Sequence, residues 1–481
     1  MRLAHAARVL GIFLMLFSFS LLPPLAVSRW YGDGEAPHFL YSMFAIFAAG
    51  LVLWLPSRGR HVELRNRDGF LVVAFYWIGL GLLGALPFMF GPHLSYVDSV
   101  FEAVSGFTTT GATVIVGLDA LPPSILYYRA QLQWLGGMGI IVLAVAILPM
   151  LGIGGMQLFR AETPGPMKDD KLTPRITHTA RALWLIYFAL TIACALALWL
   201  AGMTPFDAVI HSFAALSTGG FSSHDDSIGY FKSPLIDYIL TLFMLLGGIN
   251  FSVHFMAWRG RDVLQYWRDT EVRGFLWIVG VTSAVITAVL YLKGEYPTLP
   301  EAFRYATFQV VSVITTTGFG TANLSQWPLM TPVLLMFIGF IGGCAGSTAG
   351  GMKVVRVLLL AKQAMREMFF LVYPKGLRPI KLGSRVLPER TIQAVWGFFS
   401  LYVATFVVLM VAMMAIGVDQ VTAFSAVATC INNVGPGLGQ VAANFHDVSD
   451  GVKIISTVAM LLGRLEIFTM LVILSPAFWR R

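Results

Sequence analysis

The sequence predicts an all-α integral membrane protein, in which four tandem helix–pore-loop–helix repeats with pseudo-fourfold symmetry follow two extra N-terminal transmembrane helices. Three observations predict it: long apolar runs, basic residues concentrated in alternate connections, and a glycine-containing motif that recurs four times. Hydrophobic residues make up 57% of the 481 residues and charged residues 12%, about half the charged fraction of soluble domains. So few ionisable groups cannot cover the exterior of a water-soluble protein.

Ten apolar runs are long enough to cross a bilayer, which takes about 17–25 helical residues. Because only helices and closed barrels satisfy their backbone in lipid, runs that are apolar on every face are expected to be helices. The first run resembles a secretory leader, since Arg2 and Arg8 precede it; we expect a retained helix, with a cleaved leader as the alternative. The approximate limits are 9–28, 37–54, 70–90, 131–151, 182–201, 235–258, 275–292, 329–361 (interrupted), 391–416 and 452–474.

Lysine and arginine placement gives the direction of the chain. With a cytoplasmic N-terminus and ten crossings, 26 of the 33 basic residues fall in cytoplasmic segments. This is the positive-inside pattern, so both termini are expected in the cytoplasm. The net charge of +8 is then a topology signal and not a sign of nucleic-acid binding. The exterior receives Arg29, Arg129, Lys232, Lys293, Arg304 and Lys453, and Arg464 stays within the membrane.

Four short apolar stretches lie between the long runs and cannot span the bilayer. About twelve helical residues reach ~18 Å, half a bilayer, so each stretch is expected to enter the membrane and turn back. The stretches are 97–107, 205–216, 300–314 and 420–431. Their expected N-caps are Asp98, Thr204, Thr298 and Asp419.

Each short stretch leads into a loop that contains glycine. The glycines at 111, 219, 318 and 435 are separated by 108, 99 and 117 residues, which predicts four similar units around one axis. Glycine lets a loop turn its carbonyls inward, and a ring of carbonyl oxygens can replace the hydration shell of K⁺. The candidate K⁺ ligands are Thr109, Thr110, Gly111, Ala112, Ser217, Thr218, Gly219, Gly220, Thr316, Thr317, Gly318, Phe319, Asn433, Val434, Gly435 and Pro436.

The repeats divide the chain into five parts. The expected boundaries are 1–57 for the N-terminal helices, then 58–159, 160–260, 261–375 and 376–481 for the four repeats.

These four loops together resemble the degenerate filters of the bacterial Trk/Ktr and plant HKT potassium-transporter superfamily, and the two extra helices resemble the Trk-type subunit. The resemblance implies a K⁺ uptake pore in a bacterial cytoplasmic membrane, usually a homodimer. It also implies gating by a cytosolic regulatory subunit that binds NAD(H), ATP or ADP. In the family, glycine in the first filter accompanies K⁺ selectivity and serine accompanies Na⁺ permeation. Gly111 therefore favours potassium.

The loops depart from the TVGYG filter of tetrameric potassium channels. Ala112, Gly220, Phe319 and Pro436 align with its tyrosine. The outer ion sites are then less well defined, so we expect weaker discrimination against Na⁺.

The eighth run is interrupted at 342–351, where five of ten residues are glycine. A phosphate-binding loop would need lysine where Met352 stands, and tight helix packing through small residues is a second alternative. We favour a movable intramembrane gate, which the family resemblance also implies. The gate candidates are Gly342, Gly343, Gly346, Ser347, Thr348, Gly350, Gly351 and Arg464.

Arg464 is a cation in the middle of an apolar run, which costs about 2.5–3.5 kcal/mol on insertion scales, so it must face the protein interior. It is expected either to plug the pore below the filter or to pair with a buried acid or carbonyls. The basic segment 353–390 is the first candidate for docking the regulatory subunit.

Two other function classes remain open. A secondary transporter that couples K⁺ to H⁺ or Na⁺ also uses broken helices, but usually in two inverted repeats. An intramembrane enzyme would need a nucleophile or a set of metal ligands at membrane depth, and the long runs contain no such motif. The sequence therefore favours a channel-like potassium transporter without enzymatic activity.

Overall fold

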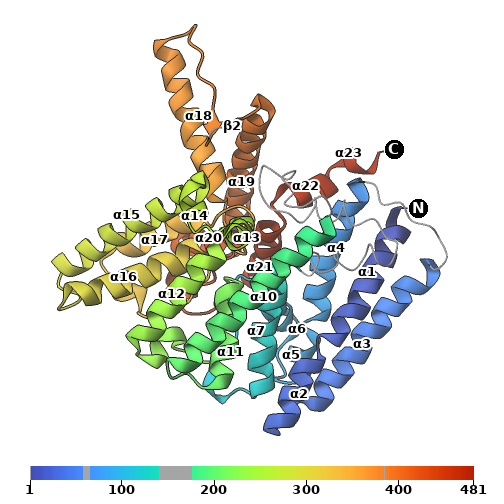
Figure 1. The fold of residues 1–481 in the computed structure, drawn as a ribbon. Coiled ribbons are helices and arrows are strands. Elements are labelled where there is room, and N and C mark those ends of the chain that lie inside the picture. Colours follow the sequence, from blue (N-terminus) through green and yellow to red (C-terminus); the bar gives the residue numbers. More distant parts are fainter. Residues whose placement is uncertain (1, 58–65, 140–175, 384, 481) are drawn as a thin grey trace.

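The computed structural model describes residues 2–57, 66–139, 176–383 and 385–480, which are mostly helical (Figure 1). The N-terminal part contains α1 (Arg2–Phe19), α2 (Leu22–Tyr31) and α3 (Ala36–Trp54). Repeat 1 contains α4 (Asn66–Leu83), α5 (Leu86–Phe90), α6 (Tyr96–Phe107) and α7 (Pro123–Met138). Repeat 2 contains α10 (Ile176–Leu200), α11 (Pro205–Leu216), α12 (Pro234–Gly248) and α13 (Phe251–Gly260), and the short α14 (Gln265–Arg268) lies at the start of repeat 3.

The second half of the chain repeats this order. Repeat 3 contains α15 (Thr270–Leu292), α16 (Leu299–Ile314), α17 (Met330–Ile341) and α18 (Val354–Val372). Repeat 4 begins with a hairpin of β1 (Lys381–Leu382) and β2 (Arg385–Val386). Repeat 4 contains α19 (Glu389–Ala415), α20 (Gln420–Asn432), α21 (Asp450–Arg464), α22 (Phe468–Leu474) and α23 (Pro476–Trp479). In Figure 1, α18 and the start of α19 project from one end of the bundle.

Among the described residues, six of the ten predicted spans are long apolar stretches of helix, two of which join α1 to α2 and α4 to α5 across a short turn. They are Ala6–Tyr31, Ala36–Trp54, Phe70–Phe90, Arg181–Leu200, Thr270–Leu292 and Glu389–Ala415. The other four predicted runs coincide with the helix that follows each pore helix. We expected a break only in 329–361, and this was wrong: α12 and α13 meet at 99°, and α21 ends at Arg464 before α22 begins. The second half of the predicted run 131–151 lies outside the described residues.

Three of these helices, α7, α12 and α21, end within two residues of a glycine that passes the end of a pore helix. Gly136, Gly247 and Gly463 each face the carbonyl oxygen of the last or next-to-last residue of the preceding pore helix. A Cβ on Gly247 would lie 3.2 Å from the oxygen of Leu216. A Cβ on Gly136 or Gly463 would lie even closer to the carbonyl oxygen that it faces. A helix that carried larger residues there could not approach so closely.

The pore helices α6, α11, α16 and α20 begin with side-chain caps. The caps at Thr204, Thr298 and Asp419 are confirmed, since each side chain accepts a hydrogen bond from the backbone N–H three residues on. The expected cap at Asp98 was wrong. Ser95 caps α6, and the Asp98 carboxylate lies 2.7 Å from the ammonium of Lys453.

Three basic residues that the sequence assigned to the exterior have acidic partners within the protein. Lys453 is 6% exposed, and Arg129 is 1% exposed with its Nε 2.8 Å from a Glu102 oxygen. Arg304 lies 3.5 Å from Asp237. Because an acid neutralises each, these residues do not weaken the positive-inside pattern.

Candidate ion-conducting site

All four pore helices end in the same backbone conformation. Two residues past the end of α6, α11 and α16, and one residue past the end of α20, the backbone is left-handed, with φ of 58° at Thr109, 53° at Thr218, 57° at Thr316 and 56° at Asn433. The next N–H bonds to a carbonyl five residues back in the pore helix, as Thr110 does with Ser105 at 2.9 Å. A glycine with positive φ then follows: Gly111, Gly220, Gly318 or Gly435.

This alignment corrects the register that the sequence predicted for the loop of repeat 2. Gly220, with φ of 79°, is the equivalent of Gly111, whereas Gly219 lacks a positive φ and corresponds to Thr110. Consequently Phe221, and not Gly220, is the residue of repeat 2 that aligns with Ala112 and with the tyrosine of TVGYG. The adjacent glycines made the register ambiguous, because the sequence does not show which of them needs the left-handed conformation.

The four loops form a closed cycle. A Cβ added to the positive-φ glycine of each loop would collide with a carbonyl oxygen of the next loop. The four pairs are Gly111 with Gly219 O, Gly220 with Thr317 O, Gly318 with Val434 O, and Gly435 with Thr110 O. We call residues 108–112, 217–221, 315–319 and 432–436 the loop ring. The structure therefore brings together every residue of the four motifs that the sequence singled out.

Polar side chains behind loops 1 and 2 hold the segment that leaves the ring. Glu102 accepts hydrogen bonds from Thr113 Oγ1 and Val114 N, both at 3.0 Å. His211 Nε2 lies 2.9 Å from Ser222 Oγ. Glu102 and His211, which the sequence left without a role, are thus equivalent supports nine residues before their glycines.

Arg129 joins the supports of repeats 1 and 2. Its guanidinium bonds Glu102 and the Ser222 carbonyl oxygen, the latter at 3.2 Å, and lies 4.2 Å from the centroid of the Phe221 ring. The sequence offered one signal for this role, a charge beside the apolar run of α7.

Removing this charge should destabilise the fold. Arg129→Leu leaves Glu102 buried without its partner, so we expect a loss of about 3–5 kcal/mol in the free energy of unfolding. Chemical denaturation in detergent measures it. Arg268→Ala, which removes an ion pair on a side chain that is 63% exposed, is the control and should cost about 1 kcal/mol or less. Equal midpoints for the two variants would contradict this role.

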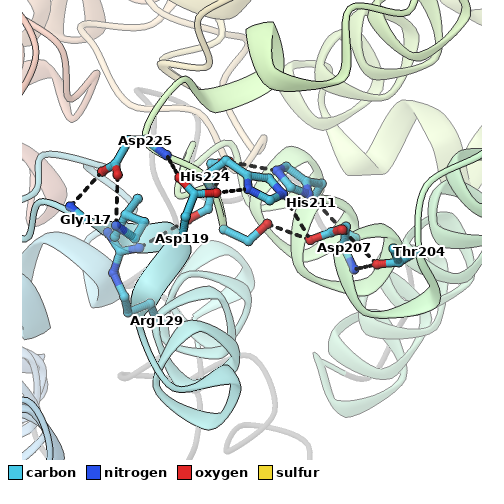
Figure 2. Close-up of polar contacts among 11 residues, drawn as sticks. Gly117, Asp119, Arg129, Thr204, Asp207, His211, His224 and Asp225 are labelled. Carbon is cyan, nitrogen blue, oxygen red and sulfur yellow. Dashed lines mark hydrogen bonds and ion pairs between the residues drawn. The ribbon is translucent and has the colours of Figure 1, made fainter.

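Figure 2 shows how repeats 1 and 2 meet beyond the loop ring. His224 Nδ1 lies 2.5 Å from Asp119 Oδ1, and its Nε2 lies 3.6 Å from Asp207 Oδ1. Asp225 accepts a hydrogen bond from the Gly117 N–H at 3.1 Å. The hydrogen bond from His224 holds the pKa of Asp119 below its usual value. These contacts fix the segment that follows loop 2 against the one that follows loop 1.

The glycine-rich segment 342–353, between α17 and α18, lies against the pore-helix ends of the loop ring. Gly350 N donates to Thr316 Oγ1 at 2.7 Å, and Gly351 N donates to Asn432 O at 3.1 Å. Thr348 Oγ1 lies 2.9 Å from Leu216 O. This segment includes seven of the eight gate candidates, and we call it the gating loop after the role that the sequence predicts for it. It therefore contacts repeats 2, 3 and 4 at once.

Arg464, the eighth gate candidate, contacts the gating loop directly. Its guanidinium donates to Thr348 O at 3.2 Å, to Gly137 O at 3.1 Å and to Gly136 O. It thereby joins repeat 4, the gating loop and the end of α7. These contacts confirm the expected pairing with carbonyl oxygens, while the role of Arg464 as a plug in the pore stays a prediction.

Sequence reasoning missed the anchor of the gating loop. One Glu271 carboxylate oxygen accepts hydrogen bonds from Ala345 N at 2.7 Å and from Val355 N at 3.0 Å. The proposed docking segment also needs correction, because Lys353 and Arg356 are each 5% exposed. Lys353 donates to Ala349 O, and Arg356 lies 2.8 Å from Glu466. The beginning of segment 353–390 thus faces the protein.

Several known proteins resemble this chain over nearly its whole length. The TrkH family model, described as a cation transport protein, matches residues 35–481. The protein named Trk system potassium uptake protein TrkH from Vibrio parahaemolyticus is 53% identical, and the match covers 100% of both chains. Its namesake from Escherichia coli K12 is also 53% identical over 98% of both chains, and TrkG from the same strain is 40% identical.

A solved structure supports the same relationship. The crystal structure of the potassium transporter TrkH from Vibrio parahaemolyticus superimposes with a TM-score of 0.91 at 50% identity, covering 100% of both chains. The all-α membrane architecture predicted from the sequence is thereby confirmed. With a family model that matches nearly the whole chain and full-length relatives at 53% identity, this chain belongs to the TrkH family of cation transport proteins.

Proposed function

We propose that this protein takes up potassium ions across the bacterial cytoplasmic membrane, and that the loop ring is its selectivity filter. The proposal rests mainly on the closed cycle of glycine–carbonyl contacts between the four loops. Four backbone loops around one axis offer oxygen atoms that can replace the water around a dehydrated cation. The four pore helices direct their C-terminal ends, where the helix dipole is negative, toward the same ring.

The names of the relatives support potassium as the transported ion, since those proteins are called potassium uptake proteins. In this proposal K⁺ is cargo bound in the ring, and no catalytic cofactor takes part.

We propose that the gating loop blocks the pathway in this conformation and that a cytosolic partner releases it. The loop contacts three repeats directly below the ring, and Arg464 and Glu271 hold it there. The partner would be a nucleotide-binding Trk subunit. It would dock on the projecting part of α18 and the β1–β2 hairpin (Figure 1), beyond the buried Lys353 and Arg356. A homodimer with both termini in the cytoplasm completes the proposal.

Ion flux into liposomes tests the transport proposal. The purified protein, reconstituted with a K⁺ gradient, should pass K⁺ and Rb⁺ with a current that reverses at the K⁺ equilibrium potential. Na⁺ should pass more slowly but measurably, because the residues after the ring glycines differ from those of TVGYG. Accumulation of K⁺ against its own electrochemical gradient, driven by a pH or Na⁺ gradient, would favour the coupled transporter instead. Complete exclusion of Na⁺ would contradict weak selectivity.

A further inference from the structure

A buried glutamine of α7 occupies the space of a missing side chain in loop 2. Gly219 corresponds to Thr110, Thr317 and Val434 in the other loops, yet its backbone is open to any L residue because its φ is not positive. A Cβ on Gly219 would collide with the Gln133 side chain, whose Oε1 would be 2.7 Å away. The backbone conformation therefore does not require glycine at position 219. The Gln133 amide requires it, because that amide occupies the space of a side chain.

The Gln133 amide makes two hydrogen bonds to the loop. Its Nε2 donates to Gly219 O at 2.6 Å, and its Oε1 accepts from Phe221 N at 3.0 Å. Gln133 is 0% exposed. The two bonds bracket Gly220, so one side chain fixes the peptide planes on both sides of that glycine.

Loops 1 and 3 are fixed in a different way. In loop 1 the Thr108 and Thr110 hydroxyls are 2.7 Å apart, and in loop 3 the Thr315 and Thr317 hydroxyls are 2.8 Å apart. Loop 2 retains a hydroxyl at the first of these positions, Ser217, but has no side chain at the second. Gln133, which comes from repeat 1, takes the place of that second hydroxyl.

We propose that Gln133 is a positioning residue for ion selectivity, which fixes the carbonyl of Gly219 in the loop ring by a hydrogen bond from a neighbouring repeat. The inference rests on the proposed function of the ring as a K⁺ filter. A carbonyl that is fixed in place discriminates between ions of different radius better than one that can follow a smaller ion inward. Gln133 therefore sets selectivity and not merely the amount of folded protein.

The test measures the ratio of K⁺ to Na⁺ uptake in proteoliposomes, which does not depend on how much protein is reconstituted. Gln133→Leu removes both hydrogen bonds at similar volume and should lower the ratio about tenfold. Gln131→Leu is the control. Gln131 is a buried glutamine of the same helix that donates to Ser20 O instead of to a loop, so the ratio should stay that of the wild type.

A rescue separates positioning from general damage. Gly219→Thr alone collides with Gln133 and should reduce uptake strongly. Combined with Gln133→Ala, it places a threonine two residues after Ser217, which gives loop 2 the pair of hydroxyls found in loops 1 and 3. The double variant should therefore restore the K⁺-to-Na⁺ ratio that Gln133→Ala alone loses. A wild-type ratio in Gln133→Leu, or a double variant as unselective as Gln133→Ala, would overturn the inference. If neither the wild type nor the ungated Arg464→Ala variant passed K⁺, that result would instead refute the proposed function.

Discussion

Replacing Gly318 with alanine should lower K⁺ uptake about 100-fold, because it adds steric collision to backbone strain. Gly318 has φ of +81°, which L residues rarely adopt, and its Cβ would collide with the Val434 carbonyl oxygen of the neighbouring loop. Either loop 3 or loop 4 must then move away from the ring. Uptake of ⁸⁶Rb⁺ into proteoliposomes, normalised to reconstituted protein, measures the loss.

Gly320 is the matched control for Gly318. It lies two residues later in the same loop, has no positive φ, and has nothing within 4 Å of the position of a Cβ. Gly320→Ala should therefore retain wild-type uptake. If Gly318→Ala and Gly320→Ala transported equally well, the close packing of loops 3 and 4 would not matter for conduction, and the proposed filter would lose its main support.

Replacing Arg464 with alanine should raise basal K⁺ flux about tenfold without any cytosolic partner, a shift of roughly 1.4 kcal/mol toward the open state. The substitution removes the charged hydrogen bonds to Thr348 O and to the carbonyls of Gly136 and Gly137. Without them the gating loop loses its connection to α7, so the blocked conformation becomes less stable. Leak current through planar bilayers that contain the purified protein measures the effect.

The control must show that loss of charge alone does not open the pore. Arg268→Ala removes a basic residue whose side chain is 63% exposed, and its leak should match the wild type. Arg464→Lys keeps the charge and should leak less than Arg464→Ala. A folded Arg464→Ala protein with wild-type leak would show that Arg464 supports the structure but does not hold the gate.

The sequence by itself predicted the architecture because each signal was local. Pro205 with the Thr204 cap placed α11, and apolar length placed the six long spans. The spacing of the glycines predicted four loops on one axis. The five glycines within 342–351 marked the segment that the structure places against the loop ring.

Tertiary structure alone decided what depends on neighbours distant in sequence. It aligned Gly220, and not Gly219, with Gly111. A glycine that a left-handed backbone requires and a glycine that the neighbouring Gln133 side chain requires cannot be told apart in a sequence. It also buried Arg129 against Glu102, 27 residues away, and attached Glu271 to a loop 74 residues away. Helix signals arise from residues within a turn of each other, whereas a filter consists of contacts between repeats about a hundred residues apart. Only the folded chain brings those contacts together, which is why the repeats could be counted in advance and their supports could not.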